Sequence, residues 1–433
     1  MKKLAGKRVL LLFTTTGYQA ASFKEAAEKL GLELIAGSDR CRNLDDPWRD
    51  GAIPLRFQNP EASASTIVKA AKNRPFDAVV AIGDKPTLTA ALACESLGLS
   101  GNPPEAVRAC RDKHRFRELL RAAQLPGPEY CRVPVSGPAR IPDGIGFPCV
   151  LKPLFLSASR GVIRANNAAE FSDAFGRIRA LLDTPDIRLL KDEAAQWIQV
   201  EEYLDGEEVA LEGIVTRGAL KVLALFDKPD PLVGPYFEET IYTTPSRLPE
   251  ATQAGIVEAA RQAIRAVGLE HGPIHAEIRL TPDGPMVLEV AARPIGGLCA
   301  RALRFEGAMS LEELILRHAL RAPHASGGVI EEFDEIEEIA RESAASGVMM
   351  VPVPSAGILS EVRGIEAAAA TPGIEEIRIT AKLHQKLVPW PEGSSYLGFI
   401  FARGSTPEKV EAALREAHAK LDFRIAPMLP VLR

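Results

Sequence analysis

Two glutamates, Glu277 and Glu289, lie in a stretch whose pattern predicts a β-hairpin. Apolar and polar residues alternate over 274–280 and again over 286–291, which is typical of half-buried strands. Residues 281–285 between them are rich in turn formers. The sequence therefore predicts two antiparallel strands that are joined by a turn and carry one carboxylate each.

If residues 281–285 form the loop, Leu280 faces Met286. Glu277 then lies directly across from Glu289, with Cβ atoms about 5 Å apart, where like charges repel. A divalent cation such as Mg²⁺ prefers oxygen ligands and would turn that repulsion into a binding site. The alternatives are two solvated glutamates on an exposed sheet face, or a one-residue register shift that separates them.

Two lysines upstream are candidates for phosphate binding. Lys152 ends a short apolar segment, and the small-residue loop after it holds Ser157, Ser159 and Gly161. Backbone N–H groups of such a loop can close over phosphate oxygens while the lysine supplies a point charge. The alternative is an ordinary turn with an exposed lysine. Lys113 lies near the start of a charged helix, where a lysine is usually a surface charge, and alone it indicates little.

The acidic stretch 200–208 and Arg293 are further candidates. The extended backbone around Glu201 and Leu204 could pair with an adenine edge, as an edge strand pairs with another chain, and Glu208 could accept ribose hydroxyls. The alternative is an acidic strand–turn–strand without a ligand. Arg293 could bind a carboxylate or phosphate with two hydrogen bonds, or form a structural salt bridge.

Composition excludes several classes of protein. The 433 residues are enough for two or three domains, and a hydrophobic content of 46% is ordinary for a globular protein. The net charge of −5 does not favour nucleic acid or an anionic membrane. No apolar run approaches the ~20 residues that span a bilayer. Six scattered cysteines predict reduced thiols in the cytoplasm: Cys41, Cys94, Cys110, Cys131, Cys149 and Cys299.

The elements that must position these residues begin with an α/β domain. Strands alternate there with helices, which predicts a parallel, doubly wound sheet: strands 7–13, 32–36 and 76–82, and helices 21–30 and 86–97. The turn after the first strand lacks G-x-G-x-x-G, so a dinucleotide fingerprint is missing.

Breakers at 101–104 mark a boundary, and an α+β pattern follows. It comprises helices 109–124, 168–182, 250–267 and 311–320, and strands 147–151, 162–165, 197–203 and 208–215. Residues 325–338 are expected to be a linker. A smaller α+β module then has strands 347–353, 374–380 and 396–402, and helices 364–369 and 406–421.

The order of motifs resembles the ATP-grasp superfamily over residues 1–320: DK, LKP with SASRGV, VEEYLDGEE, HAE and LEVAARPIGG. The resemblance implies an α/β and α+β multidomain protein with a Rossmann-like pre-ATP-grasp domain at 1–110. An ATP-grasp domain of two α+β subdomains follows at 111–325, with a lid at about 141–203, then a C-terminal module at 326–433. By motif, Lys113, Lys152 and the loop bind ATP phosphates. Glu201 and the Leu204 backbone hold adenine, Glu208 binds ribose, and Glu277 and Glu289 bind Mg²⁺, for which Mn²⁺ could substitute.

A closer resemblance is to the bacterial L-amino acid ligases, carried by residues 234–249, 346–359 and 394–404. It implies that Glu239 and Tyr242, together with His275, line the amino acid pocket, and that Arg293 holds the reacting carboxylate or acyl phosphate. The chain departs from the family pattern at Ala291, where many members have Asn, and at Tyr242, where a related dipeptide ligase has His. Metal coordination and acceptor choice could therefore differ.

The function expected on these grounds is ATP-dependent ligation of a carboxylate to an amine. An amide or peptide bond between amino acids would form through an acyl phosphate, with release of ADP and phosphate. The alternatives are bicarbonate- or biotin-dependent carboxylation on the same scaffold, and ATP binding without turnover. The expected partners are ATP and small amino acid or carboxylate substrates, with a possible homodimer and with neither nucleic acid nor membrane.

Overall fold

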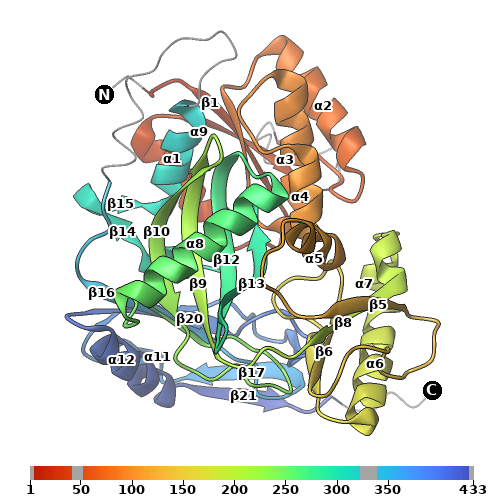
Figure 1. Cartoon of the computed structure of the whole chain (residues 1–433). Helices are drawn as coiled ribbons and strands as arrows, with labels where there is room; N and C mark the ends of the chain where they lie inside the picture. Colours follow the sequence, from red (N-terminus) through yellow and green to blue (C-terminus); the bar gives the residue numbers. More distant parts are fainter. Residues whose placement is uncertain (1–3, 41–51, 322–338, 429–433) are drawn as a thin grey trace.

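The computed structural model describes residues 4–40, 52–321 and 339–428. A four-stranded parallel sheet in the order β3-β2-β1-β4 organises the N-terminal region, as predicted (Figure 1). Its elements are β1 (Arg8–Phe13), α1 (Ala20–Leu30), β2 (Glu33–Ser38), β3 (Ile53–Pro54), α2 (Pro60–Asn73), β4 (Ala78–Ala81) and α3 (Asp84–Leu97). Alternate residues of β1 pack towards α1 on one face and towards α2 and α3 on the other, which makes the sheet doubly wound. Helix α2 is an element that the sequence analysis did not identify.

The helix predicted over 109–124 is two helices, α4 (Pro104–Arg111) and α5 (Lys113–Ala122). Asp112 between them is extended, with φ −120° and ψ 107°, and its carboxylate accepts hydrogen bonds from the N–H groups of His114 and Arg115. An aspartate in this position caps the first turn of the new helix. Lys113 therefore begins α5 at the break.

A small antiparallel sheet in the order β5-β8-β6-β7 is built mostly from residues that were predicted to form a lid, and the lid itself stays a prediction. This region contains β5 (Tyr130–Pro134), β6 (Cys149–Pro153), β7 (Ile163–Ala165), α6 (Ala168–Leu182), α7 (Pro185–Arg188) and β8 (Trp197–Glu202). Phe171, Phe175 and Ile178 of α6 are buried against Leu151 of β6 and Val200 of β8.

An eight-stranded sheet, β13-β12-β9-β10-β11-β16-β20-β18, forms the rest of the scaffold. Its elements are β9 (Glu207–Thr216), β10 (Ala219–Asp227), β11 (Ile241–Thr244), α8 (Glu250–Val267), β12 (His271–Thr281), β13 (Gly284–Ala291), β16 (Ala345–Val351), β18 (Ile374–Ile379) and β20 (Gly398–Gly404). Helix α8 lies across one face of β9 and β12 (Figure 1). The sheet runs through the predicted boundary at 325/326, because β11 pairs with β16. The domain boundaries themselves stay predictions, and the predicted linker lies outside the described residues.

Smaller elements complete the chain. Strands β14 (Arg304–Phe305) and β15 (Met309–Ser310) precede α9 (Leu311–Arg321), and a three-stranded sheet joins β17 (Gly357–Arg363), β19 (Lys386–Leu387) and β21 (Asp422–Ala426). Helices α11 (Ile365–Ala369) and α12 (Pro407–Ala419) belong to the same C-terminal part. Within the described ranges, no helix combines the length and the apolar character that crossing a membrane requires.

The hairpin β12–β13 has the predicted pairing of Glu277 with Glu289, but not the predicted turn. The strands continue to Thr281 and Gly284, so Leu280 pairs with Pro285 rather than with Met286. A bulge next to Glu277 adds one residue to β13 and restores the alignment of the two glutamates.

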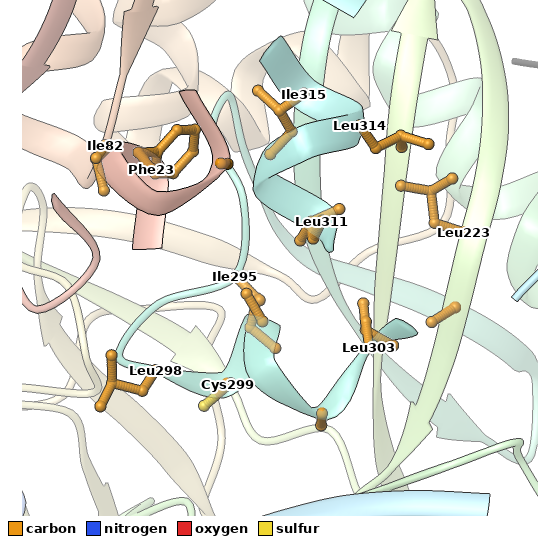
Figure 2. Close-up of a cluster of buried hydrophobic side chains, with 14 of the residues drawn as sticks. Phe23, Ile82, Leu223, Ile295, Leu298, Cys299, Leu303, Leu311, Leu314 and Ile315 are labelled. Atoms are coloured by element: carbon orange, nitrogen blue, oxygen red, sulfur yellow. The ribbon is translucent and has the colours of Figure 1, made fainter. Parts of the chain in front are cut away.

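One hydrophobic core joins the N-terminal sheet to the large sheet. Figure 2 shows Ile295, Leu298 and Cys299, from the segment after β13, in the same cluster as Phe23 of α1 and Leu311 of α9. All five side chains are at most 3% exposed. This packing fixes the segment that carries Arg293 relative to both sheets.

Candidate active site

A cavity of about 310 Å³ lies between the small antiparallel sheet, the large sheet and the carboxyl end of the N-terminal sheet. Thirteen of the fourteen predicted site residues line it: Lys113, Lys152, Ser157, Ser159, Glu201, Leu204, Glu208, Glu239, Tyr242, His275, Glu277, Glu289 and Arg293. Gly161 does not, and its N–H donates a hydrogen bond to the carbonyl of Pro391 at 2.7 Å. The structure therefore brings together residues that are up to 180 positions apart in the sequence, from Lys113 to Arg293.

The strand β12 has two different faces. Ile274, Ala276 and Ile278 are fully buried beneath α8. His275 and Arg279 point the other way, yet each is only 4% exposed, so this face borders a cavity rather than open solvent. The period-two pattern thus predicted the two faces, while the alternative of an exposed sheet face is wrong.

The paired carboxylates project from this second face. The Glu277 side chain is 19% exposed and that of Glu289 is 29% exposed. Burial and the charge of Glu289 each raise the pKa of Glu277, but Lys228 nearby, at 3.5 Å, contributes to a net lowering of that pKa. Glu289 in turn lies 3.6 Å from the ammonium group of Lys113.

This donor set fits a hard divalent cation. Two carboxylates at paired ladder positions, both open to the cavity, supply oxygen ligands and leave coordination positions for a phosphate. When bound, such an ion offsets the negative charge of the phosphates.

Lys152 is held by a buried ion-pair cluster. Its ammonium group contacts the carboxylate of Glu201, which also accepts hydrogen bonds from Arg117 at 2.8 and 3.3 Å. Burial raises the pKa of Glu201, but the charges of Arg117 and Lys152 outweigh it and lower the pKa. Burial and the charges of Arg117 and Lys113 lower the pKa of Lys152, and together they outweigh Glu201, which raises it.

The edge-strand hypothesis for the Glu201 backbone is wrong. Strand β8 lies between β5 and β6, so Glu201 is paired with Tyr130 on one side and Val150 on the other. Its backbone groups are already used by the sheet, and only the residues after β8, including Leu204, line the cavity beyond the ladder.

Asp84, at the start of α3, is a site residue that the sequence analysis missed. Its carboxylate accepts two hydrogen bonds from Arg293, at 2.8 and 3.2 Å, and a further one from Ser157. Burial raises its pKa, but Arg293 and Lys113 outweigh burial and lower it. The available signal was its position three residues after the end of β4, since ligands of open parallel sheets bind at the carboxyl ends of strands.

Arg293 thus makes the structural salt bridge that was its alternative interpretation, while its side chain still lines the cavity. The ammonium group of Lys113 donates to the carbonyl of Leu156 at 2.8 Å, which ties α5 to the small-residue loop. The Arg293–Asp84 and Lys113–Leu156 contacts thus each join elements from different parts of the chain at the cavity wall.

Lys228, just after β10, was also missed because it stands in a breaker-rich loop. It contacts Glu208 at 2.6 Å, Glu277 at 3.5 Å and the carboxylate of Glu239. Oxygen atoms of these three glutamates all lie within 4.8 Å of one another. Burial disfavours the charged lysine, but the three carboxylates together raise its pKa well above the ordinary value. Glu208 also accepts from Arg279 at 2.6 Å, directly across the β9–β12 ladder.

Tyr242 and His275 are two further buried residues that line the cavity. Tyr242 is 2% exposed, lies with its ring 5.1 Å from the Lys228 ammonium group, and hydrogen-bonds Glu239. His275 lies across the ladder from Glu212, with Nδ1 at 3.2 Å from its carboxylate. Burial lowers the pKa of His275, but hydrogen bonds to Glu212 and Glu277 raise it to about 9.

Comparison with known families agrees with this geometry. Residues 145–302 match the ATP-grasp domain family, and residues 24–101 match the ATP-grasp N-terminal domain. Residues 349–426 match L-amino acid ligase C-terminal domain 2. The chain belongs to the ATP-grasp superfamily.

This ATP-grasp protein is similar over nearly its whole length to an L-amino acid ligase from Bacillus licheniformis. The TM-score is 0.78 at 26% identity, with 98% of this chain and 99% of the other covered. It is 30% identical over 295 residues to alanine–anticapsin ligase of Bacillus subtilis (strain 168), a match of 64% of this chain and 61% of that one. Carnosine synthase 1 of Gallus gallus is 33% identical over 313 residues, or 68% of this chain and 33% of that protein. The matched segment thus spans about three fifths of the bacterial relative and a third of the avian one.

Proposed function

We propose that this ATP-grasp protein is a ligase that uses ATP to join the carboxylate of one amino acid to the amine of another. The observation that carries the proposal is the pairing of Glu277 with Glu289 in one cavity with Lys113 and Lys152. Support comes from the C-terminal region of L-amino acid ligase type and from the ligase structure that resembles the chain throughout.

In the proposed reaction, a carboxylate oxygen attacks the γ-phosphorus of ATP, and the bond to the β–γ bridging oxygen breaks to release ADP. The amine nitrogen of the second substrate then attacks the acyl carbon of the acyl phosphate. Phosphate leaves, the nitrogen loses a proton, and an amide forms. Lys113 and Lys152 would bind the phosphates as point charges, and the loop 154–162 would supply N–H donors.

We assign the remaining predicted residues to the two substrates. Leu204 and Glu208 would contact the adenosine, and Glu239, Tyr242 and His275 would line the amino acid end. Arg293, aligned by Asp84, would face the reacting carboxylate. Glu201 would act through Lys152, because its carboxylate is taken by that lysine and by Arg117.

Mg²⁺ is the ion we propose for the paired glutamates, with Mn²⁺ as a substitute. A cytoplasmic location agrees with the free thiols of the described cysteines Cys94, Cys110, Cys131, Cys149 and Cys299. A homodimer and the lack of a nucleic acid partner stay predictions.

The test is a screen of all pairs of the twenty common amino acids with Mg²⁺ and ATP, in which ADP and new amide products are both measured by mass spectrometry. We expect at least one pair to give ADP and amide in equal amounts, and a Glu289→Gln variant to give neither. If ADP forms but none of the pairs gives an amide, the result contradicts ligation. ATP turnover that requires bicarbonate and no amino acid would instead favour a carboxylase.

A further inference from the structure

A segment of the C-terminal part, residues 390–392, lies against the small-residue loop 154–162. The indole N–H of Trp390 donates to the carbonyl of Ala158 at 3.0 Å, and the N–H of Gly161 donates to the carbonyl of Pro391 at 2.7 Å. Arg160 donates to the carbonyl of Glu392 at 2.9 Å. Three consecutive residues thus hold three positions of a loop that is 232 residues away along the chain.

The loop needs such support because its conformation is unfavourable in isolation. Ala158 and Ser159 have φ angles of 56° and 52°, in a region that residues with a Cβ rarely adopt. Residues held in this region persist only where surrounding contacts determine their conformation. The contacts from 390–392 are of that kind, since they bind the loop on both sides of Ser159.

The same segment is anchored to helix α6 by charge. The Glu392 carboxylate accepts two hydrogen bonds from Arg177 of α6, at 2.8 and 2.9 Å. On its other side, the buried ring of Trp390 packs on Tyr396, with ring centroids 4.9 Å apart, and Tyr396 lines the cavity. Trp390 is therefore held by Tyr396 while its N–H reaches the loop.

We propose that Trp390 and Glu392 are positioning residues that hold the loop 154–162 closed over the phosphates of the nucleotide. This inference rests on the proposed function. A loop held in place keeps its N–H donors in position for phosphate and excludes water from a reactive acyl phosphate. Neither residue would touch the reacting atoms.

The test compares Trp390→Phe with a matched control, Trp197→Phe. Phenylalanine keeps an aromatic ring against Tyr396 but has no N–H for Ala158. Trp197 begins β8, and the guanidinium group of Arg132 lies over its ring. Three quantities are measured: hydrogen exchange of the amides in 156–162, affinity for the non-hydrolysable analogue AMP-PNP, and the ratio of phosphate released to amide formed.

For Trp390→Phe we expect exchange in the loop to rise about fivefold and AMP-PNP affinity to fall by a similar factor, as for the loss of one hydrogen bond. The ratio of phosphate to amide should rise above one, because water reaches the acyl phosphate. Trp197→Phe should change none of the three. Loop exchange and affinity that stay at wild-type values in Trp390→Phe would overturn the proposal.

A second variant guards against misfolding of the first. Arg177→Gln removes the charged anchor of Glu392 at a side chain that is 39% exposed, and it should raise loop exchange in the same direction. Loop exchange is measured without substrates, so its result does not depend on ligation. A wild-type protein that forms no amide, but whose loop is released by Trp390→Phe, would refute the ligase and uphold the positioning role.

Discussion

Replacing Lys228 by methionine should reveal how strongly the cavity wall depends on one buried cation. The side chain of Lys228 is 3% exposed and lies among the carboxylates of Glu208, Glu239 and Glu277. Methionine preserves most of the length and apolar volume of the stem but leaves three acidic groups without this cation. Arg279 still neutralises Glu208, so Glu239 and Glu277 are the carboxylates that lose most of their compensating positive charge.

The magnitude follows from the distances. At an effective dielectric constant of about 20, the attraction of Lys228 for Glu208 at 2.6 Å is about 6 kcal/mol, and for Glu277 at 3.5 Å about 5 kcal/mol. Much of this attraction only offsets the cost of burying the charges. Removing one partner of a buried ion pair therefore has a net cost of about 3–5 kcal/mol, which we expect for Lys228→Met.

The assay is urea unfolding at pH 8 and at pH 5. The free energy of unfolding that Lys228→Met loses should be smaller at pH 5 than at pH 8, because carboxylates deprived of Lys228 take up protons as the pH falls. The matched control is Lys7→Met, since Lys7 also lies 2.6 Å from a carboxylate, that of Asp77, but its side chain is 47% exposed. That variant should lose at most about 1 kcal/mol. Equal losses for the two variants would refute the reasoning.

Three further predictions concern other charged groups. Arg117→Met should cost about 3 kcal/mol in urea unfolding, because it leaves Glu201 buried with only part of its ion-pair network; a loss below 1 kcal/mol would contradict this. Burial raises the pKa of Glu238 from 4.5 to about 7, so the folded protein holds this proton more tightly than the unfolded chain, and stability falls as the pH rises through that range. Glu238→Gln should accordingly gain about 1 kcal/mol at pH 8, after allowance for partial exposure, and nothing at pH 4; thermal unfolding that shows the same gain at both pH values would exclude this cause. Arg293→Lys loses the two-point contact with Asp84 and should lower kcat/KM about 10- to 100-fold in the ligation assay, whereas unchanged kinetics would remove Arg293 from the site.

The elements that local sequence patterns specify were predicted well. Helices α6 and α8 begin and end where the apolar period predicted, at 168–182 and 250–267. Asn167 caps the first through its side chain, and Gly268 ends the second with a φ of 83°. Both boundaries depend only on residues within one turn, which the sequence shows directly.

The hairpin was predicted correctly at the glutamates for a partly wrong reason. The turn is tighter than the five residues expected, and a bulge in β13 compensates for the difference. Bulges have no strong signature in a single sequence, since they depend on how a strand bends against its neighbours. The pairing of Glu277 with Glu289 was therefore recoverable, and the pairing of Leu280 was not.

The residues that were missed act through contacts across long sequence separations. Asp84 meets Arg293 from 209 positions away, and Arg117 meets Glu201 from 84. The sequence around an acidic or basic residue does not indicate such a distant partner, because the pair forms only when separate elements pack together. Glu212 is different, because the period of two along β9 puts it on the same face of the strand as Glu208, and both side chains are buried.

The most direct test of the central claim is to locate the metal ion. Crystals grown with AMP-PNP and Mn²⁺ in place of Mg²⁺ would show the ion by its anomalous scattering. The account predicts an ion coordinated by both Glu277 and Glu289 and by phosphate oxygens, with Lys113 and Lys152 on the same phosphates. An ion bound elsewhere in the cavity, or a nucleotide whose phosphates lie away from both glutamates, would contradict it.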